Sequence, residues 1–186
     1  MMTRTITLAL ILVGIMDVAS LGTVSAFDPA ALEELQARKQ CPSCELSAAD
    51  LHGARLDGAD LNGTSLDVAD LSGATLTGAR MQKAHLIATN LSGADLRRAD
   101  LTGAHAIAAR LDGADLSGAD LRGANLRGAT LTGATLTAAR LDGADLSGAD
   151  LRGATLTGAH LDKAWLDNTI WVDGRLCAHS SVGACR

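Results

Sequence analysis

A five-residue repeat constrains this sequence more than any other feature. From residue 44 to residue 168 every fifth residue is leucine, except at Met81 and Ala106. The residue two places before each of these central positions is alanine in all but three repeats, the exceptions being Cys44, Thr64 and Thr89. No insertion or deletion breaks the register, so this segment is one continuous repeat array.

Neither an α-helix nor a flat strand can bury this pattern. A helix would scatter residues five apart around all its faces, and frequent glycine would destabilise it. A flat strand sends residues five apart to opposite faces. A chain that turns once per repeat, near the residue two places after the centre, can keep alanine and leucine facing a common axis. Its coils then pair edge to edge, so the sequence predicts an all-β repeat solenoid.

Composition excludes several other classes. The chain has 186 residues with 20 glycines but only 2 prolines, and glycine does not recur every third residue, so it is not collagen. Its three aromatic residues (Phe27, Trp165 and Trp171) leave leucine and alanine to build the core. The formal net charge is −5, so we expect no nucleic-acid partner.

The repeat resembles that of the pentapeptide-repeat family, whose unit is small, polar, leucine or phenylalanine, polar, small. Ala-Asp-Leu-Ser-Gly at residues 114–118 is such a unit, and the resemblance covers residues 44–168. The resemblance implies a right-handed quadrilateral β-helix with four repeats per coil and about six coils. Equivalent residues four repeats apart would then stack on one another.

The first residues are typical of a secretory signal peptide. Arg4 supplies a positive charge, residues 6–16 form an apolar run, and small residues precede a cleavage point at Phe27. We therefore assign residues 1–26 to a signal peptide. This predicts an exported protein, periplasmic or secreted, without stable membrane insertion after cleavage.

The two ends of the array are predicted to be capped. Residues 27–43 form a short helical cap, with Asp28 as the capping residue and Pro29 at the first helical position. Residues 169–186 form a C-terminal cap in which Trp171 continues the central phase. Trp165 either extends that cover or marks a homodimer contact.

Four cysteines lie outside the regular array. An even count in an exported chain favours disulfides, and the rod would hold its two ends too far apart for a bond between them. We therefore pair Cys41 with Cys44 and Cys177 with Cys185. Thiol–disulfide exchange at the C-x-x-C motif is an alternative. Zinc would need four converging ligands and only one close pair exists, so no metal is expected.

One irregular segment suggests an interaction surface. His85 and Ile87 lie four repeats before His105 and Ile107, so the four-sided arrangement places each pair side by side on the exterior. We interpret these four residues as a candidate partner-binding patch whose affinity changes as the histidines become charged. The alternative is local sequence drift in a tolerant array.

The remaining surface has mixed charge. Asp60, Arg80, Asp100, Asp120 and Arg140 would stack along one side as a charge ladder. Such patterning is typical of a solvated surface.

No motif indicates catalysis. The sequence lacks a serine elbow, a phosphate-binding glycine loop before a helix, and a His-Glu metal motif, so we expect no enzyme activity and no cofactor. The expected function is an exported structural or protein-interaction scaffold whose protein partner is not identified by the sequence. Some members of the resembled family bind DNA gyrase as acidic mimics of duplex DNA, which makes such an inhibitor the alternative. Interspersed arginines and the predicted export argue against it.

Overall fold

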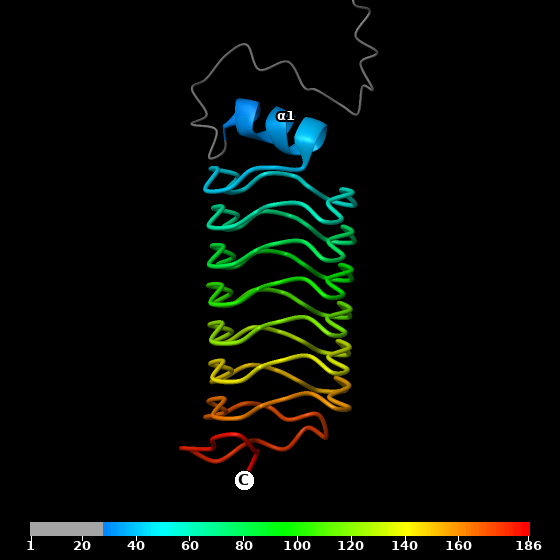
Figure 1. The fold of residues 1–186 in the computed structure, drawn as a ribbon. Coiled ribbons are helices and arrows are strands. Elements are labelled where there is room, and N and C mark those ends of the chain that lie inside the picture. Colours follow the sequence, from blue (N-terminus) through cyan, green and yellow to red (C-terminus); the bar gives the residue numbers. More distant parts are fainter. Residues whose placement is uncertain (1–27) are drawn as a thin grey trace, which may run out of the picture.

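The computed structural model describes residues 28–186 as a stack of similar coils, with one helix across the first coil and an irregular tail at the other end (Figure 1). The predicted signal peptide lies outside the described residues. Within residues 28–186, no helix combines the length and apolar character needed to cross a bilayer.

Each coil pairs with the next at a spacing of four repeats. Asp95 bridges Asp115 and Thr135 bridges Thr155, both in parallel orientation, and the same spacing runs from Gln40 to Ile170. Each side of a coil contributes a single bridging residue rather than a longer strand. Four repeats therefore complete one circuit of the axis, and the predicted β-solenoid is confirmed.

Between the first and last coils, the backbone of each repeat is bonded to both neighbouring coils. The N–H of the central residue donates to the carbonyl of the residue that precedes the equivalent central residue on the next coil. Leu116 donates to Thr135 in this way, at 2.7 Å. The preceding residue donates to the carbonyl just before its bridging partner on the previous coil, as Asp115 does to Ala94 at 3.0 Å. These bonds hold the coils together over the whole array.

A tight turn closes every repeat. The Ala119 N–H donates to the Leu116 carbonyl at 3.0 Å, and Gly118 between them has a φ of 67°. A bond from the fourth residue to the first, with positive φ at the third, is typical of a type II turn. The third residue has positive φ in every repeat from residue 48 to residue 168, which confirms the predicted position of the bend.

The aspartate before the central leucine has a structural role that the sequence pattern did not reveal. The N–H following the central residue is left out of the ladder between coils. In the repeat of Leu116, the Asp115 Oδ1 accepts this N–H from Ser117 at 3.0 Å. Asn125 does the same for Arg127. The recurring Asp-Leu pair is thus explained, because the carboxylate satisfies the one backbone donor that the coils cannot.

The core is a column of leucine and alanine. Central residues between Leu46 and Leu151 are at most 4% exposed. Threonine takes the inner position twice within the array and once just after it. All three side chains are fully buried, and each hydroxyl donates to a main-chain carbonyl of the preceding coil, the residues being Thr64, Thr89 and Thr169. Each of these three buried hydroxyls is therefore satisfied by a hydrogen bond.

Helix α1 (Pro29–Arg38) lies over the first coil. The Asp28 side chain accepts the Ala30 N–H at 2.9 Å, and Lys39 ends the helix with a φ of 54°. Leu35 is fully buried against the core. This end of the core is therefore covered, since Leu51 beneath the helix is only 4% exposed.

The tail covers only half of the other end. It pairs antiparallel with two sides of the last coil, through Trp165 with Val182 and Ile170 with Leu176. On the other two sides Leu156 and Leu161 are partly exposed, and their N–H groups have no partner within residues 28–186. The predicted C-terminal cover thus extends over two sides of four, because the chain turns back before completing another coil.

Candidate interaction surface

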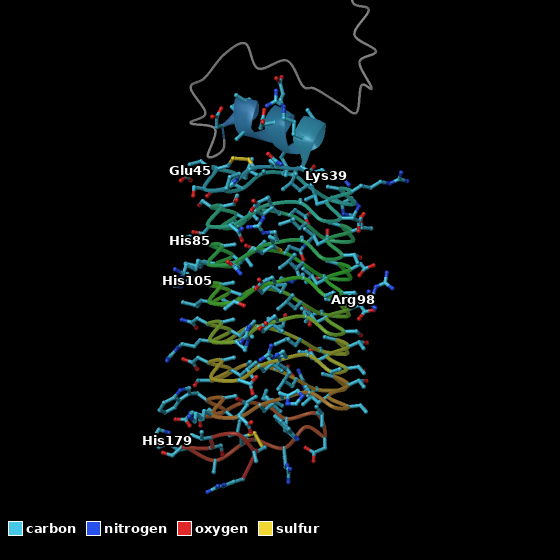
Figure 2. All side chains as sticks on the ribbon, in the orientation of Figure 1. Lys39, Glu45, His85, Arg98, His105 and His179 are labelled. Carbon is cyan, nitrogen blue, oxygen red and sulfur yellow. A yellow bond between two sulfur atoms is a disulfide. The ribbon has the colours of Figure 1, made fainter. Side chains whose placement is uncertain are left out.

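The two histidines of the predicted patch lie side by side. His85 and His105 are bridging partners on adjacent coils, with ring centres 5.2 Å apart and ring planes 28° apart. Both side chains are exposed and project from the same side of the stack (Figure 2). The spacing of four repeats accounts for this contact, since equivalent positions on successive coils face the same direction.

The two isoleucines also occupy neighbouring coils. The Ala88 N–H donates to the Ile107 carbonyl at 2.9 Å, which places the turn after Ile87 directly beside Ile107. Ile87 is 39% exposed and Ile107 is half-buried. The structure therefore brings all four predicted patch residues onto one side.

Val68 extends this surface, although the sequence did not lead us to predict it as a patch residue. Its N–H donates to the Ile87 carbonyl at 2.9 Å, so it lies on the coil before the isoleucine. Val68 is 65% exposed and has a φ of 62°. A β-branched residue is strained at positive φ, and an exposed valine gains little from burial. The available signal was its place in the repeat, where the other turns carry glycine, alanine, lysine, arginine or asparagine.

We call these five residues the apolar patch; they are Val68, His85, Ile87, His105 and Ile107. The Asp67 carboxylate accepts the Ile87 N–H at 2.7 Å. The N–H of Ile107 has no acceptor within the described part of the chain. The residue in the corresponding place on the preceding coil is Ile87, which has no carboxylate. The patch thus offers aliphatic surface, two imidazoles and one open backbone donor.

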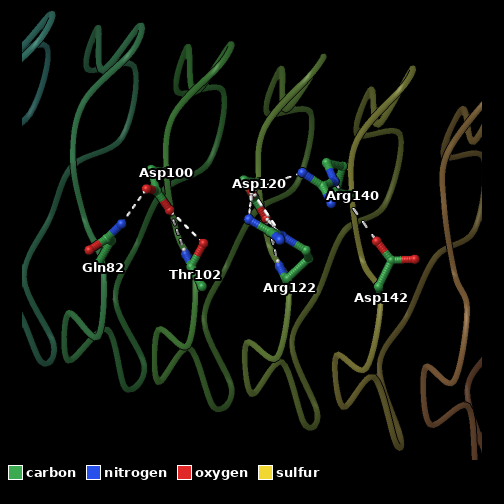
Figure 3. Close-up of polar contacts among 7 residues, drawn as sticks. All are labelled: Gln82, Asp100, Thr102, Asp120, Arg122, Arg140 and Asp142. Carbon is green, nitrogen blue, oxygen red and sulfur yellow. Dashed lines mark hydrogen bonds and ion pairs between the residues drawn. The ribbon is translucent and has the colours of Figure 1, made fainter.

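The predicted charge ladder is only partly formed: within residues 28–186 no ion pair joins Arg80 to Asp100, and Figure 3 shows the section from Asp100 to Arg140. Arg80 lies 3.5 Å from Asp60, and Arg140 lies 3.7 Å from Asp120. Asp100 stacks on Asp120, where two carboxylates meet instead of alternating charges.

Neighbouring polar groups stabilise that interruption. Burial raises the pKa of Asp100, but hydrogen bonds from Thr102 and Gln82, each at 2.6 Å, outweigh this and leave the pKa lowered. The ladder is therefore held by hydrogen bonds at the point where charge alternation fails.

Four arginines form ion pairs with the aspartate two residues before them, these being Arg97, Arg122, Arg152 and Arg175. The Arg97 guanidinium donates to Asp95 at 2.6 and 2.8 Å and lowers the pKa of that carboxyl to about 2. The same arrangement lowers the pKa values of two further carboxyls through Arg122 and Arg152, these being Asp120 and Asp150. The surface therefore carries paired charge rather than a continuous acidic face.

The cysteines are joined within each end of the rod. Cys41 is bonded to Cys44 with a Cα–Cα distance of 5.3 Å, and Cys177 to Cys185 with a distance of 4.9 Å. Cys41 and Cys177 are at most 1% exposed. No group of three or more histidine, cysteine, aspartate or glutamate side chains within residues 28–186 is arranged to hold a metal ion.

Comparison with known proteins identifies the repeat. The family model described as pentapeptide repeats matches eight copies in this chain, over residues 44–82, 79–118, 99–137, 109–148 and 136–170. Functionally curated protein sequences give no match.

Several solved structures of repeat proteins are similar to the chain. HetL from Nostoc sp. strain PCC 7120, a pentapeptide repeat protein involved in heterocyst differentiation regulation, is 32% identical over 74% of this chain and 80% of its own, with a TM-score of 0.43. Rfr23 from Cyanothece 51142 is 28% identical over 76% of this chain and 97% of its own, with a TM-score of 0.41. A trypsin-treated variant of QnrB1, a plasmid-mediated fluoroquinolone resistance protein, is 18% identical over 77% and 86%, with a TM-score of 0.44.

The TM-scores are all below 0.5, so the assignment does not depend on superposition. It follows from the family match, which covers more than half of the chain, and from the spacing of four repeats between paired coils. The chain belongs to the pentapeptide-repeat family.

Proposed function

We propose that the protein is an exported, non-catalytic scaffold that binds a protein partner through the apolar patch. The body of the scaffold is a right-handed solenoid of about six coils, covered at one end by α1 and on two of four sides at the other end by the disulfide-bonded tail. The solenoid supplies rigidity, and the patch supplies recognition.

Val68 is the observation that carries this proposal. It combines a strained backbone with exposed aliphatic surface, although glycine serves the same turn in most other repeats. Strain that a protein retains at an exposed site is a reason to look for function there. Ile87 and Ile107 continue the same surface onto two further coils, which makes it a contiguous apolar area rather than isolated side chains.

The charge distribution favours this role over mimicry of nucleic acid. A mimic needs a continuous negative surface. Arg97, Arg122 and Arg152 each bind a carboxylate directly, at 2.6 Å, and break up such a surface.

Three arginine-paired carboxylates are also poorly suited to general acid catalysis. Asp95, Asp120 and Asp150 have lowered pKa values because arginine donates hydrogen bonds to each carboxylate. A general acid works best with a pKa near the working pH. These three carboxylates therefore stay ionised and form ion pairs on the protein surface.

Thiol exchange is the less favoured use of the cysteines. Exchange requires that a thiolate reaches the sulfur it attacks. Cys41 is 1% exposed beneath α1, so the bond is shielded on one side. Disulfides at both ends agree with export, since oxidising compartments preserve them.

The test is affinity capture from the extracytoplasmic fraction of cells that produce the chain. Wild-type protein is compared with an Ile87→Asp, Ile107→Asp double variant and with a control carrying Thr137→Asp and Thr157→Asp. The control changes the equivalent repeat positions on another side of adjacent coils. We expect wild type and control to retain a partner protein that the patch variant loses. Equal capture by all three would contradict the assignment of the patch, and a mature chain confined to the cytoplasm would contradict export.

A further inference from the structure

His85 and His105 have an arrangement that protein interaction alone does not require. Their rings stack with centres 5.2 Å apart on adjacent coils. Their neighbours above and below in the same column are Ser65 and Asn125, neither of which carries a charge. The pair is therefore two imidazoles presented together, without a carboxylate in the column beside them.

The ring nitrogens of this pair have no hydrogen-bond partners in the described part of the chain. Two other histidines differ in this respect. The His52 Nδ1 lies 2.9 Å from the Ser72 hydroxyl, and the His179 Nδ1 lies 3.2 Å from an Asp167 carboxylate oxygen. The paired rings thus remain available to an external ligand.

The distance between the rings suits a metal ion. Two imidazole nitrogens bound to one tetrahedral Zn²⁺ at ~2.1 Å place the ring centres about 5 Å apart. The observed separation is 5.2 Å, with the rings stacked and their planes 28° apart, so both side chains must change rotamer to turn one nitrogen of each toward a shared point. Both rings are exposed, and no hydrogen bond within residues 28–186 opposes this rotation.

We propose that His85 and His105 form a two-histidine site for a late divalent transition metal. Imidazole is a common ligand of Cu²⁺, Ni²⁺ and Zn²⁺, whereas Ca²⁺ and Mg²⁺ prefer oxygen ligands. Water completes the coordination, because the column of bridging residues offers no third imidazole or carboxylate, and the Asp67 carboxylate on the neighbouring coil already accepts the Ile87 N–H at 2.7 Å. The usual order of divalent affinities predicts tighter binding of Cu²⁺ than of Zn²⁺. The site does not depend on the proposed protein partner.

Calorimetric titration of the untagged, oxidised protein with CuCl₂, ZnCl₂ and CaCl₂ tests the site. We expect Cu²⁺ to bind more tightly than Zn²⁺, with no binding of Ca²⁺ at the histidines. His85→Gln and His105→Gln should each weaken Cu²⁺ binding ~10-fold or more, because each removes one of two ligands. His52→Gln and His160→Gln remove exposed histidines that have no histidine beside them and should leave the affinity within about twofold.

Electron paramagnetic resonance of the Cu²⁺ complex gives a second readout. The wild-type spectrum should show coupling to two imidazole nitrogens, and either patch variant should show one. Circular dichroism establishes that the variants are folded. The proposal is overturned if the wild type does not bind Cu²⁺, if His52→Gln weakens binding as much as His85→Gln, or if the two-nitrogen coupling survives in His105→Gln.

Discussion

At the scale of single residues, the aspartate before the central leucine closes the hydrogen-bond pattern of the repeat. Asp115 accepts the Ser117 N–H, and Asn90 and Asn125 fill the same role elsewhere. The requirement is therefore for a short side chain with an acceptor oxygen rather than for a negative charge.

Replacing Asp115 tests this role. Asp115→Ala should lower the free energy of unfolding by about 1–2 kcal/mol, since the Asp115 Oδ1 accepts both the Ser117 N–H and the Ser117 hydroxyl. Asp115→Asn keeps the acceptor and should stay close to wild type. Urea unfolding of both variants measures the difference. An equal loss in both would point to charge as the stabilising property.

Val68 is a second residue whose effect can be measured. Val68→Gly relieves a left-handed backbone conformation that costs ~1–2 kcal/mol in an L residue, partly offset by the greater freedom of glycine in the unfolded chain. We expect a net stabilisation of about 1 kcal/mol in thermal unfolding, together with weaker capture of the partner. The reciprocal change Gly118→Val, at the same turn position, should destabilise. A neutral or destabilising Val68→Gly would remove the argument from strain.

At the scale of structural elements, most of the solenoid could be predicted from the leucine period. Burial of one leucine in five, with an odd spacing, leaves few backbone geometries available. The position of the turn followed from the same spacing. The role of Asp115 did not, because it depends on which N–H groups the neighbouring coils leave unpaired. Val68 occupies the predicted turn position, where a β-branched residue is unusual, but its exposure beside Ile87 became evident only from the stacking of the coils.

The ends of the rod show the limit of the same reasoning. Every repeat follows the same sequence pattern, so the sequence predicts the same burial for Leu161 as for Leu116. In the structure, Leu116 is fully buried whereas Leu161 is partly exposed beside an uncovered edge. How far a tail without repeats folds back depends on its own contacts, here the antiparallel pairing of Trp165 with Val182.

The two leucines should therefore differ in their energetic contribution. Leu116→Ala should cost roughly 2–5 kcal/mol, the range for truncating a buried leucine, while Leu161→Ala should cost clearly less. Denaturant midpoints of the two variants, followed by circular dichroism, provide the comparison. Equal losses would mean that the last coil is as well covered as the middle of the array.

At the scale of the whole molecule, the paired carboxylates make the free energy of unfolding decrease at acid pH. The pKa of Asp95 is about 2 in the folded protein and ~3.9 in an unfolded chain. A lowered pKa stabilises the fold above the unfolded value, and this contribution is lost as pH falls through the folded value. The pKa values of Asp120 and Asp150 are lowered in the same direction.

Thermal unfolding measured against pH tests this dependence. The melting temperature should fall as pH drops from ~4 to ~2, and Asp95→Asn should reduce the size of that fall. Asp162→Asn is the control, because Asp162 is exposed and makes no ion pair within residues 28–186. An unchanged acid response in Asp95→Asn would contradict the assignment.

Every surface feature described above depends on equivalent residues of successive coils lying side by side. Nuclear Overhauser contacts between backbone protons measure this stacking directly. We predict contacts between Asp95 and Asp115, between His85 and His105, and between Thr135 and Thr155. Helical contacts from one turn to the next through the array, or pairing at any spacing other than four repeats, would contradict the solenoid and with it the apolar patch.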